Sequence, residues 1–549
     1  MPVDGICGVI ELKKQLDYKS YRQAILEMVA ADLHVVQENH VRQLTSCRKA
    51  FELIGKFVAD DAEHLGNHER AYVPETKTFY LHLYKAKLSP DGFERVVWTV
   101  NGTYPGPTLV VTKGDRLVIH VINNLGVSTS IHYHGFFQRG TNWYDGVPGQ
   151  TQCPIPNNTT FIYNFTVPDQ SAIIVKDPDD PYQNDYDEEV VILLSDWYHN
   201  ETFTLLNYYL SPASKGLEPR PDNGLINGRN NYNCKWVPVS YKCIDNAVEG
   251  MMTKRHTIHR LIINVAQRYS VIVTADKLVS NFWMRADLQI TCYNAIGIEY
   301  LNPYVKAIVH YEGANHLDPT TKGWADNLNR LNNCIDLNTS DLKPFFPENV
   351  PAKADQTIYL NASIEKDASN VYRGVVNGST YVVDVDNPTI NQILFKNQTL
   401  FQPNQNVIGQ FNTSQVIDIV AYNGVTGEHP FHLHGHTFWV LGSGPVDTKP
   451  DFSKLNIFDP IKRDTATIPN KGWIVIRFEA NNPGIWGFHC HIEWHVEAGL
   501  VAQFIELPHE LRKLKPPADW EQLCIKSPNH YNDLILQSEQ RTIIDDMRN

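Results

Sequence analysis

Short runs of β-branched and aromatic residues recur along most of this chain and predict an all-β protein. Clusters of Gly, Pro and Asn bound each run, as is typical of turns between strands. Strands at this spacing, without long helical patterns between them, are typical of Greek-key β-sandwiches. No internal repeat is evident in the sequence. Clear examples of the predicted strands are Leu117–Val121, Glu189–Leu194, Tyr269–Val273 and Ile474–Phe478.

The amino-terminal 70 residues follow a different pattern. Between Tyr18 and Ala62 the apolar residues recur at helical spacing, so residues 1–70 are predicted to form a short helical extension before the β-sandwich core. Met1 to Leu12 contain two acidic residues and lack the apolar stretch of a secretory signal peptide. No apolar run reaches the 18 or more residues of a membrane span, so we expect no membrane partner.

Length and charge narrow the class of protein. A chain of 549 residues is long enough for two or three domains, and 42% hydrophobic residues suit a globular protein. The formal net charge of −13 argues against nucleic acid as a partner and is compatible with cationic substrates.

The most informative segment is His489-Cys490-His491-Ile492-Glu493-Trp494-His495, with one thiol and three imidazoles in seven residues. In an extended strand, side chains at i and i+2 share a face, so His489 and His491 are predicted to serve one metal site and Cys490 another. A thiolate with imidazoles selects blue copper, a one-electron centre. The alternative is a buried cysteine beside unrelated histidines, but three histidines at this spacing have no packing rationale.

Two further histidine clusters support a metal function. The segment from His429 to His436 places His432 and His434 on one face, with His429 off it, and His132-Tyr133-His134 offers two more imidazoles. A lone His-x-His pair is more often a solvated or core pair, but the three clusters together are specific for metal chemistry.

Taken together, these clusters resemble three of the four copper-binding segments of the multicopper oxidases, the superfamily of laccases, ferroxidases and ascorbate oxidase. The resemblance covers roughly Tyr72 to Cys524 and is greatest to fungal laccases and ferroxidase-like enzymes. It implies three cupredoxin-like domains, at residues 71–171, 172–325 and 326–549. It also rests on the segments Val100–Gly102, Thr141–Trp143, Gln152–Ile155 and Ser195–His199.

Residue by residue, the resemblance assigns ligands to copper, of which up to four ions are expected. It makes His429, Cys490 and His495 the blue-copper ligands, with Leu500 at the axial position, where a side chain without a ligand atom favours a high reduction potential. His436 is not a family ligand and is predicted to be structural. At the oxygen-reducing cluster, the mononuclear copper would be held by His132 and His432, and the binuclear pair by His134, His434, His489 and His491.

Three carboxylates match family positions. Asp145 and Glu493 match acids beside the oxygen site, where the reduction of oxygen consumes protons, although Asp145 also suits a turn before Gly146. Asp196 matches the acid that contacts the reducing substrate, where it could accept a proton or hold a ferrous ion. Its other interpretation is a strand-end cap.

The chain also departs from the family. The fourth copper segment, which carries a His-x-His pair, is missing: no histidine lies between His134 and His199, and the segment looks excised at about Ser171. Each binuclear copper is left with two of its three expected ligands, and an underligated site loses affinity steeply. The first sheet should gain an unprotected edge. A second shortfall near Asn246–Gly250 predicts a second domain that lacks part of one sheet.

Cysteine and sequon usage point to a secretory route. The resemblance pairs Cys153 with Cys524 in a disulfide, and Cys234 with Cys243 could close a local loop. Asn-x-Ser/Thr sites occur ten times, which favours a secreted, extracellular glycoprotein despite the absence of a signal peptide in this sequence.

Two functions of different classes follow. The first is a laccase-type oxidase, with dioxygen as acceptor and a phenolic or aromatic-amine donor, or ferrous iron if the chain is a ferroxidase. The second is an inactive relative that retains only the blue-copper site; a copper-storage or electron-transfer protein is a third possibility. The missing histidine pair favours an impaired oxidase, and we expect a monomer.

Overall fold

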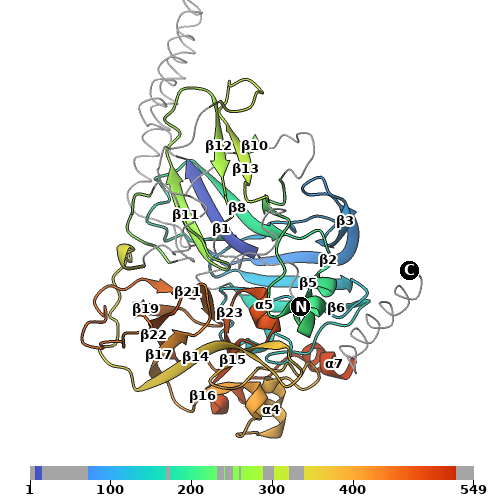
Figure 1. Ribbon diagram of the computed structural model, residues 1–549, viewed down its shortest axis with the longest axis vertical. Helices are drawn as coiled ribbons and strands as arrows, with labels where there is room; N and C mark the ends of the chain where they lie inside the picture. The colour runs from blue at the N-terminus through green and yellow to red at the C-terminus, as the bar shows by residue number, and fades with distance from the viewer. Residues whose placement is uncertain are drawn as a thin grey trace, which may run out of the picture.

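The computed structural model describes residues 6–14, 72–167, 174–230, 240–241, 251–258, 261–288, 302–320 and 339–526. Strands dominate these residues and form three groups of sheets, and the described helices are short (Figure 1). The all-β prediction is therefore confirmed. The four strand examples taken from the sequence lie in β5, β8, β11 and β22.

The first group carries the amino-terminal histidine pair. Its main sheet has the order β3-β2-β5-β6, and alternate residues of β5 are buried, as period-2 patterning requires. The elements are β2 (Thr76–Leu88), β3 (Arg95–Val100), β4 (Val110–Thr112), β5 (Arg116–Asn124), β6 (Thr159–Thr166) and β7 (Ile174–Lys176). Strand β7 lies beyond the predicted boundary at residue 171 and pairs in parallel with β4 in a separate two-stranded sheet, and the boundary stays a prediction.

The third group is a two-sheet sandwich. One sheet runs β15-β14-β17-β22-β19-β20 and the other β16-β24-β23-β18-β21, and their facing apolar residues form one large core. The strands of the first sheet are β14 (Gln356–Lys366), β15 (Tyr372–Val376), β17 (Gln415–Asn423), β19 (Phe438–Pro445), β20 (Lys462–Arg463) and β22 (Gly472–Ala480). Those of the second are β16 (Val407–Phe411), β18 (His429–Leu433), β21 (Thr465–Ile468), β23 (Gly484–Cys490) and β24 (Val501–Glu506).

The second group is smaller. A four-stranded sheet, β11-β1-β8-β9, accompanies a three-stranded sheet, β10-β13-β12. Among the described residues, its shared core contains only Ile192, Ile226 and Val305 as fully buried apolar side chains. The strands are β1 (Ile6–Lys14), β8 (Glu188–Trp197), β9 (Asn223–Ile226), β10 (Ser240–Tyr241), β11 (Arg268–Val273), β12 (Asn281–Arg285) and β13 (Lys306–His310).

The predicted helical extension over residues 1–70 is wrong for Ile6–Lys14. This segment forms β1, which lies between β8 and β11 in Figure 1 and pairs antiparallel with β8 and parallel with β11. Its Ile and Val content suits a strand, and its insertion gives partners to backbone groups that would otherwise form two open edges. The helical periodicity of residues 18–62 lies outside the described residues.

A repeated Asn-Gly turn relates the three groups, although no repeat was evident in the sequence. Asn101, Asn227 and Asn377 each adopt a positive φ of 49° to 54° before a glycine. Each side chain accepts a backbone N–H from a neighbouring strand and donates to a carbonyl two residues earlier on that strand, respectively in β2, β8 and β14. The same Asn-Gly turn, with the same two side-chain hydrogen bonds, therefore occurs in each of the three sheet groups.

The carboxyl-terminal part of the chain packs on the first group. Trp520, on α7 (Ala518–Lys526), is buried and donates its indole N–H to the Thr151 carbonyl at 3.1 Å, and the predicted disulfide Cys153–Cys524 is present. Cys234 and Cys243 lie outside the described residues. None of the described helices is long and apolar enough to cross a membrane. The other α-helices of the described residues are α3 (Thr202–Tyr209), α4 (Thr389–Lys396), α5 (Glu493–Glu497) and α6 (Pro508–Leu511).

Candidate copper centres

The predicted blue-copper ligands converge in the third sheet group. His429 begins β18, Cys490 ends β23 and His495 lies in α5. The Nδ1 atoms of both histidines lie 3.5 Å from Cys490 Sγ, and all three residues are buried. Copper prefers soft thiolate and imidazole ligands, so a group of one thiol and two imidazoles fits this metal.

Strand pairing explains why adjacent residues serve different sites. In the antiparallel pair of β18 and β23, Phe431 lies opposite Cys490, and His432 lies opposite His489. Phe431 and Cys490 face the apolar core, while His432 and His489 bring their rings to 5.9 Å on the other face. The sequence argument from alternation therefore describes the observed arrangement.

Leu500 is joined to the same site by backbone hydrogen bonds with Cys490 and His495. Its side chain is fully buried in the core that contains Cys490, and its carbonyl accepts the Cys490 backbone N–H at 3.3 Å. A Cβ at Gly374 would lie 2.4 Å from the Leu500 nitrogen, so glycine is required for this close packing. The leucine offers no ligand atom, which agrees with its predicted axial role, and that role stays a prediction.

The acid that contacts the blue-copper triad is Glu218, which sequence reasoning missed. His495 Nε2 donates to Glu218 Oε1 at 2.6 Å, and the glutamate side chain is 38% exposed. Glu218 lies in a loop 277 residues away in sequence, so no local motif could have identified it. Asp196 lies on β8 opposite Gly224 of β9, and its predicted contact with a reducing substrate stays a prediction.

The two histidines of this triad have very different pKa values in the metal-free protein. Burial would lower the pKa of His495, but the charges of Glu218 and Cys490 raise it to about 10 in the metal-free protein. Burial, reinforced by His495, lowers the pKa of His429 to about 3. Burial would also raise the pKa of Glu218, but the attraction of His495 lowers it overall. At neutral pH, therefore, His429 is neutral and His495 and Glu218 form an ion pair.

Copper(II) loading of the metal-free protein is expected to strengthen with pH, because copper must displace a proton from His495. Displacement of the His495 proton contributes about tenfold per pH unit to the affinity up to about pH 10, and the Cys490 thiol, which must also lose its proton to bind copper, contributes equally in both proteins. In Glu218→Gln the pKa of His495 falls, so the affinity should level off at a lower pH. Chelator-competition titrations at pH 6 to 10 measure both slopes, and equal slopes in the two proteins would contradict this account.

Six further imidazoles converge on the opposite face of β23. The pair predicted for the mononuclear copper, His132 and His432, has ring centroids 6.2 Å apart. The rings of the predicted binuclear ligands are close in two pairs, His134 with His491 at 5.1 Å and His434 with His489 at 5.0 Å. The structure therefore brings together all six histidines that the resemblance assigned to the oxygen-reducing cluster.

Hydrogen bonding prepares four of these rings for metal. The Nδ1 atoms of His132 and His432 donate to the backbone carbonyls of Asp145 and Asp464, and their buried Nε2 atoms have no hydrogen-bond partner. His434 and His489 also direct Nδ1 at oxygen, and their Nε2 atoms face each other at 2.9 Å. In the neutral state these nitrogens present unshared lone pairs, which a metal ion would satisfy.

Asp145 is the acid of this cluster. Its fully buried carboxylate accepts from His434 Nδ1 at 2.9 Å and lies 3.4 Å from His132 Nδ1. Burial would raise the pKa of Asp145, but these two histidines hold it well below its usual range. Asp145 also follows the short helix Asn142–Tyr144 and precedes Gly146, where a Cβ would collide with the Ile131 carbonyl. Asp145 therefore both lies in a turn before glycine and contacts the histidines.

The other two predicted residues have different settings. Glu493 is the first residue of α5 and is half-buried, and its predicted role as an acid stays a prediction. His436 donates from Nδ1 to the His434 carbonyl and packs edge-on against Phe478 and Trp486. These contacts support the structural role expected for His436.

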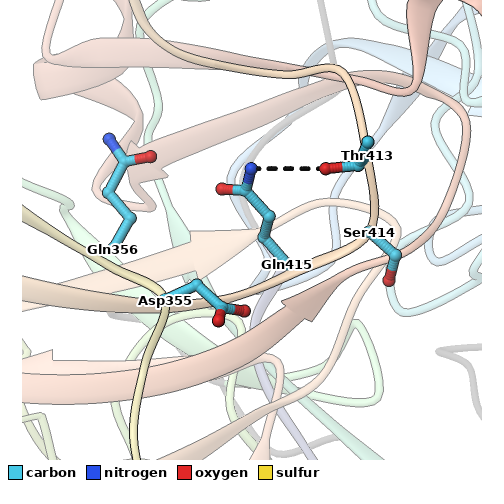
Figure 2. Close-up of a pocket in the computed structure, with 5 residues that line it drawn as sticks. All are labelled: Asp355, Gln356, Thr413, Ser414 and Gln415. Atoms are coloured by element: carbon cyan, nitrogen blue, oxygen red, sulfur yellow. Dashed lines mark hydrogen bonds between the residues drawn. The ribbon is translucent and has the colours of Figure 1, made fainter.

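A separate surface hollow lies at the edge of the third group. Figure 2 shows its lining, Asp355, Gln356, Thr413, Ser414 and Gln415, with Gln415 donating to Thr413 at 3.5 Å. None of these residues belongs to the histidine clusters, and the hollow adjoins the sequon at Asn412. We assign no donor site to it.

Comparison with known proteins agrees with this geometry. Sequence models described as multicopper oxidase match residues 82–175, 188–248, 243–314 and 378–510. The laccase of Phlebia radiata is 34% identical over 502 residues, which cover 81% of this chain and 92% of that protein. The iron transport multicopper oxidase FetC of Epichloe festucae is 33% identical over 500 residues, which cover 80% and 78%.

Solved structures give the same result. The laccase of Botrytis aclada aligns with a TM-score of 0.73 at 28% identity, over 84% of this chain and 94% of that one. Fet3p, described as a multicopper oxidase that functions in iron import, aligns with a TM-score of 0.71 at 28% identity, over 82% and 94%. Since family models, relatives and cupredoxin-like neighbours agree with the two histidine-rich centres, this chain belongs to the multicopper oxidases, which are copper-dependent oxidoreductases.

Proposed function

We propose that this chain oxidises phenolic or aromatic-amine donors one electron at a time, as laccases do, and that its reduction of dioxygen to water is impaired. The observation that supports the proposed oxidation of donors is the Glu218–His495 contact. It links the buried cysteine triad to a partly exposed carboxylate, the kind of group that a donor in solution can reach.

Glu218 has a defined task in this proposal. Loss of an electron makes a phenol strongly acidic, so a carboxylate that is ionised at neutral pH is suited to accept the proton. The same carboxylate fixes the ring orientation of His495 through Nε2. Copper, when bound, supplies the one-electron chemistry. Cys490 lies between His489 and His491 in the chain, so the backbone connects the donor side to the oxygen side.

Ferrous iron is the second candidate donor. A carboxylate oxygen is also a ligand for divalent iron, and Glu218 carries a negative charge directly against the blue-copper triad. Similarity to an iron transport oxidase and to a laccase is nearly equal, so the relatives favour neither donor.

The impairment rests on the missing histidine pair. No histidine occurs between His134 and His199, and six imidazoles meet where the family pattern requires eight. The proposed excision point at Ser171 lies outside the described residues. An inactive relative that retains only the blue-copper site is the extreme form of this proposal.

We also infer an extracellular location. Its support is the Cys153–Cys524 disulfide, which joins residues 371 positions apart, together with the ten sequons.

Anaerobic mixing of the copper-loaded chain with a phenol, and separately with ferrous iron, tests donor and impairment independently. We expect the phenol to bleach the blue absorption rapidly and subsequent oxygen to restore it slowly. Glu218→Gln should slow bleaching without changing the restoration rate. Bleaching by ferrous iron alone would favour a ferroxidase, and rapid oxygen consumption would overturn the impairment.

A further inference from the structure

Arg268 enters the oxygen-side histidine cluster from the second sheet group. It is the first residue of β11, is 7% exposed, and its Nη1 donates to His134 Nε2 at 2.9 Å. The same nitrogen donates to Asp464 Oδ1 at 2.7 Å, and Nη2 donates to the second carboxylate oxygen at 2.5 Å. The guanidinium thus bridges a histidine of the first group and a carboxylate of the third.

Asp464 explains why the cation is held there. Its carboxylate is 1% exposed and is also within 3.5 Å of His134 Nε2 and 3.7 Å of His432 Nδ1. A buried carboxylate requires a compensating cation, and the bidentate fork of arginine supplies one with good geometry. The Ala266 carbonyl also lies 2.9 Å from Nη1, so the two hydrogens of that nitrogen are shared among three acceptors.

This contact distinguishes His134 from four of the other five predicted ligands of this cluster. Arginine can only donate, so in this hydrogen bond the lone pair of His134 Nε2 is the acceptor. By contrast, the Nε2 atoms of His132 and His432 have no hydrogen-bond partner, and those of His434 and His489 face each other. A copper ion at His134 Nε2 would have to displace the guanidinium and would meet its positive charge.

We propose that Arg268 is a resident cation of this cluster, that it takes the place of a metal ion at His134, and that this chain does not use His134 as a copper ligand. Copper is then held by the remaining imidazoles, of which His132, His432 and His434 form a group with ligand atoms within 4.8 Å of one another. The proposal rests on the proposed function only in taking copper as the metal, and it gives the impaired oxygen step a second cause.

Copper content of the full chain tests the assignment. The protein is stripped of metal and reloaded with copper(II), and copper per chain is measured by elemental analysis. We expect His134→Ala to retain as much copper as the unsubstituted chain, while the matched control His434→Ala loses at least one ion per chain. Loss of an ion in His134→Ala would overturn the proposal.

Substitution of Arg268 tests the same proposal through the number of metal ions that the chain binds. Arg268→Met leaves His134 Nε2 and Asp464 Oδ1, which lie 3.5 Å apart, without their guanidinium and free to bind a metal ion. We expect this variant to take up one additional divalent ion per chain, measured with copper(II) and with cobalt(II), and Arg268→Lys to take up none. An unchanged metal count in a folded Arg268→Met would overturn the proposal.

The two proposals fail separately. Bleaching of the blue absorption by a phenol depends on Cys490 and Glu218 and not on His134, so it reports on the donor reaction alone. If Arg268→Met does not fold, the comparison of His134→Ala with His434→Ala still decides the assignment.

Discussion

Cys490→Ser is expected to abolish the blue absorption and to lower donor oxidation by more than about 100-fold. Loss of an outer partner of a metal ligand costs about 10- to 100-fold, and Cys490 is the predicted central ligand, 3.5 Å from both histidine nitrogens. Serine keeps the size of the buried side chain but removes the soft thiolate that selects copper. Absorption spectroscopy of the copper-loaded protein, with anaerobic donor kinetics, measures both effects.

The same variant carries its own control. His489 and His491 flank Cys490, but their rings join the oxygen-side cluster, so the copper held by that cluster should remain. Elemental analysis should therefore show loss of about one ion per chain, with an unchanged circular-dichroism spectrum. Retention of a blue centre in Cys490→Ser, or loss of all copper, would contradict the separation of the two sites.

Asp418→Ala is expected to lower the free energy of unfolding by about 3–5 kcal/mol. Asp418 of β17 lies opposite Arg477 of β22, and its two oxygens accept bonds of 2.7 and 2.8 Å from the guanidinium. Both side chains are at most 5% exposed. Removal of the carboxylate leaves a buried cation without its counter-charge in the central sheet of the third group, which is the costly case for an ion pair. Urea denaturation followed by tryptophan fluorescence measures the loss.

A surface pair provides the comparison. Asp451 and Lys454 lie 2.8 Å apart but are 47% and 80% exposed, so Asp451→Ala should lower the stability far less than Asp418→Ala. Replacement of both buried partners, as in Asp418→Leu with Arg477→Met, should recover most of the stability lost in Asp418→Ala. Equal losses in Asp418→Ala and Asp451→Ala would refute the assigned role of burial.

Local periodicity was sufficient to predict much of the fold and the separation of the predicted copper ligands onto two faces of a strand. Alternation in β5 and β22 follows directly from residue type, because side-chain direction in a strand has a period of two. The same rule separated Cys490 from His489 before any pairing partner was known. The amino-terminal strand was missed because a segment of nine residues has no local reason to insert between β8 and β11.

The sequence by itself therefore determined the candidate chemistry and the local geometry. It shows the thiol and imidazoles at fixed spacing, the strands in which successive side chains alternate between faces, and the missing histidine pair. Only the tertiary structure determined which residues from distant segments contact these histidines. Glu218 meets His495 across 277 residues, and Arg268 meets His134 across 134 and Asp464 across 196. Burial then determines their ionisation, because the electrostatic cost of each charge depends on partners that only the packed sheets bring together.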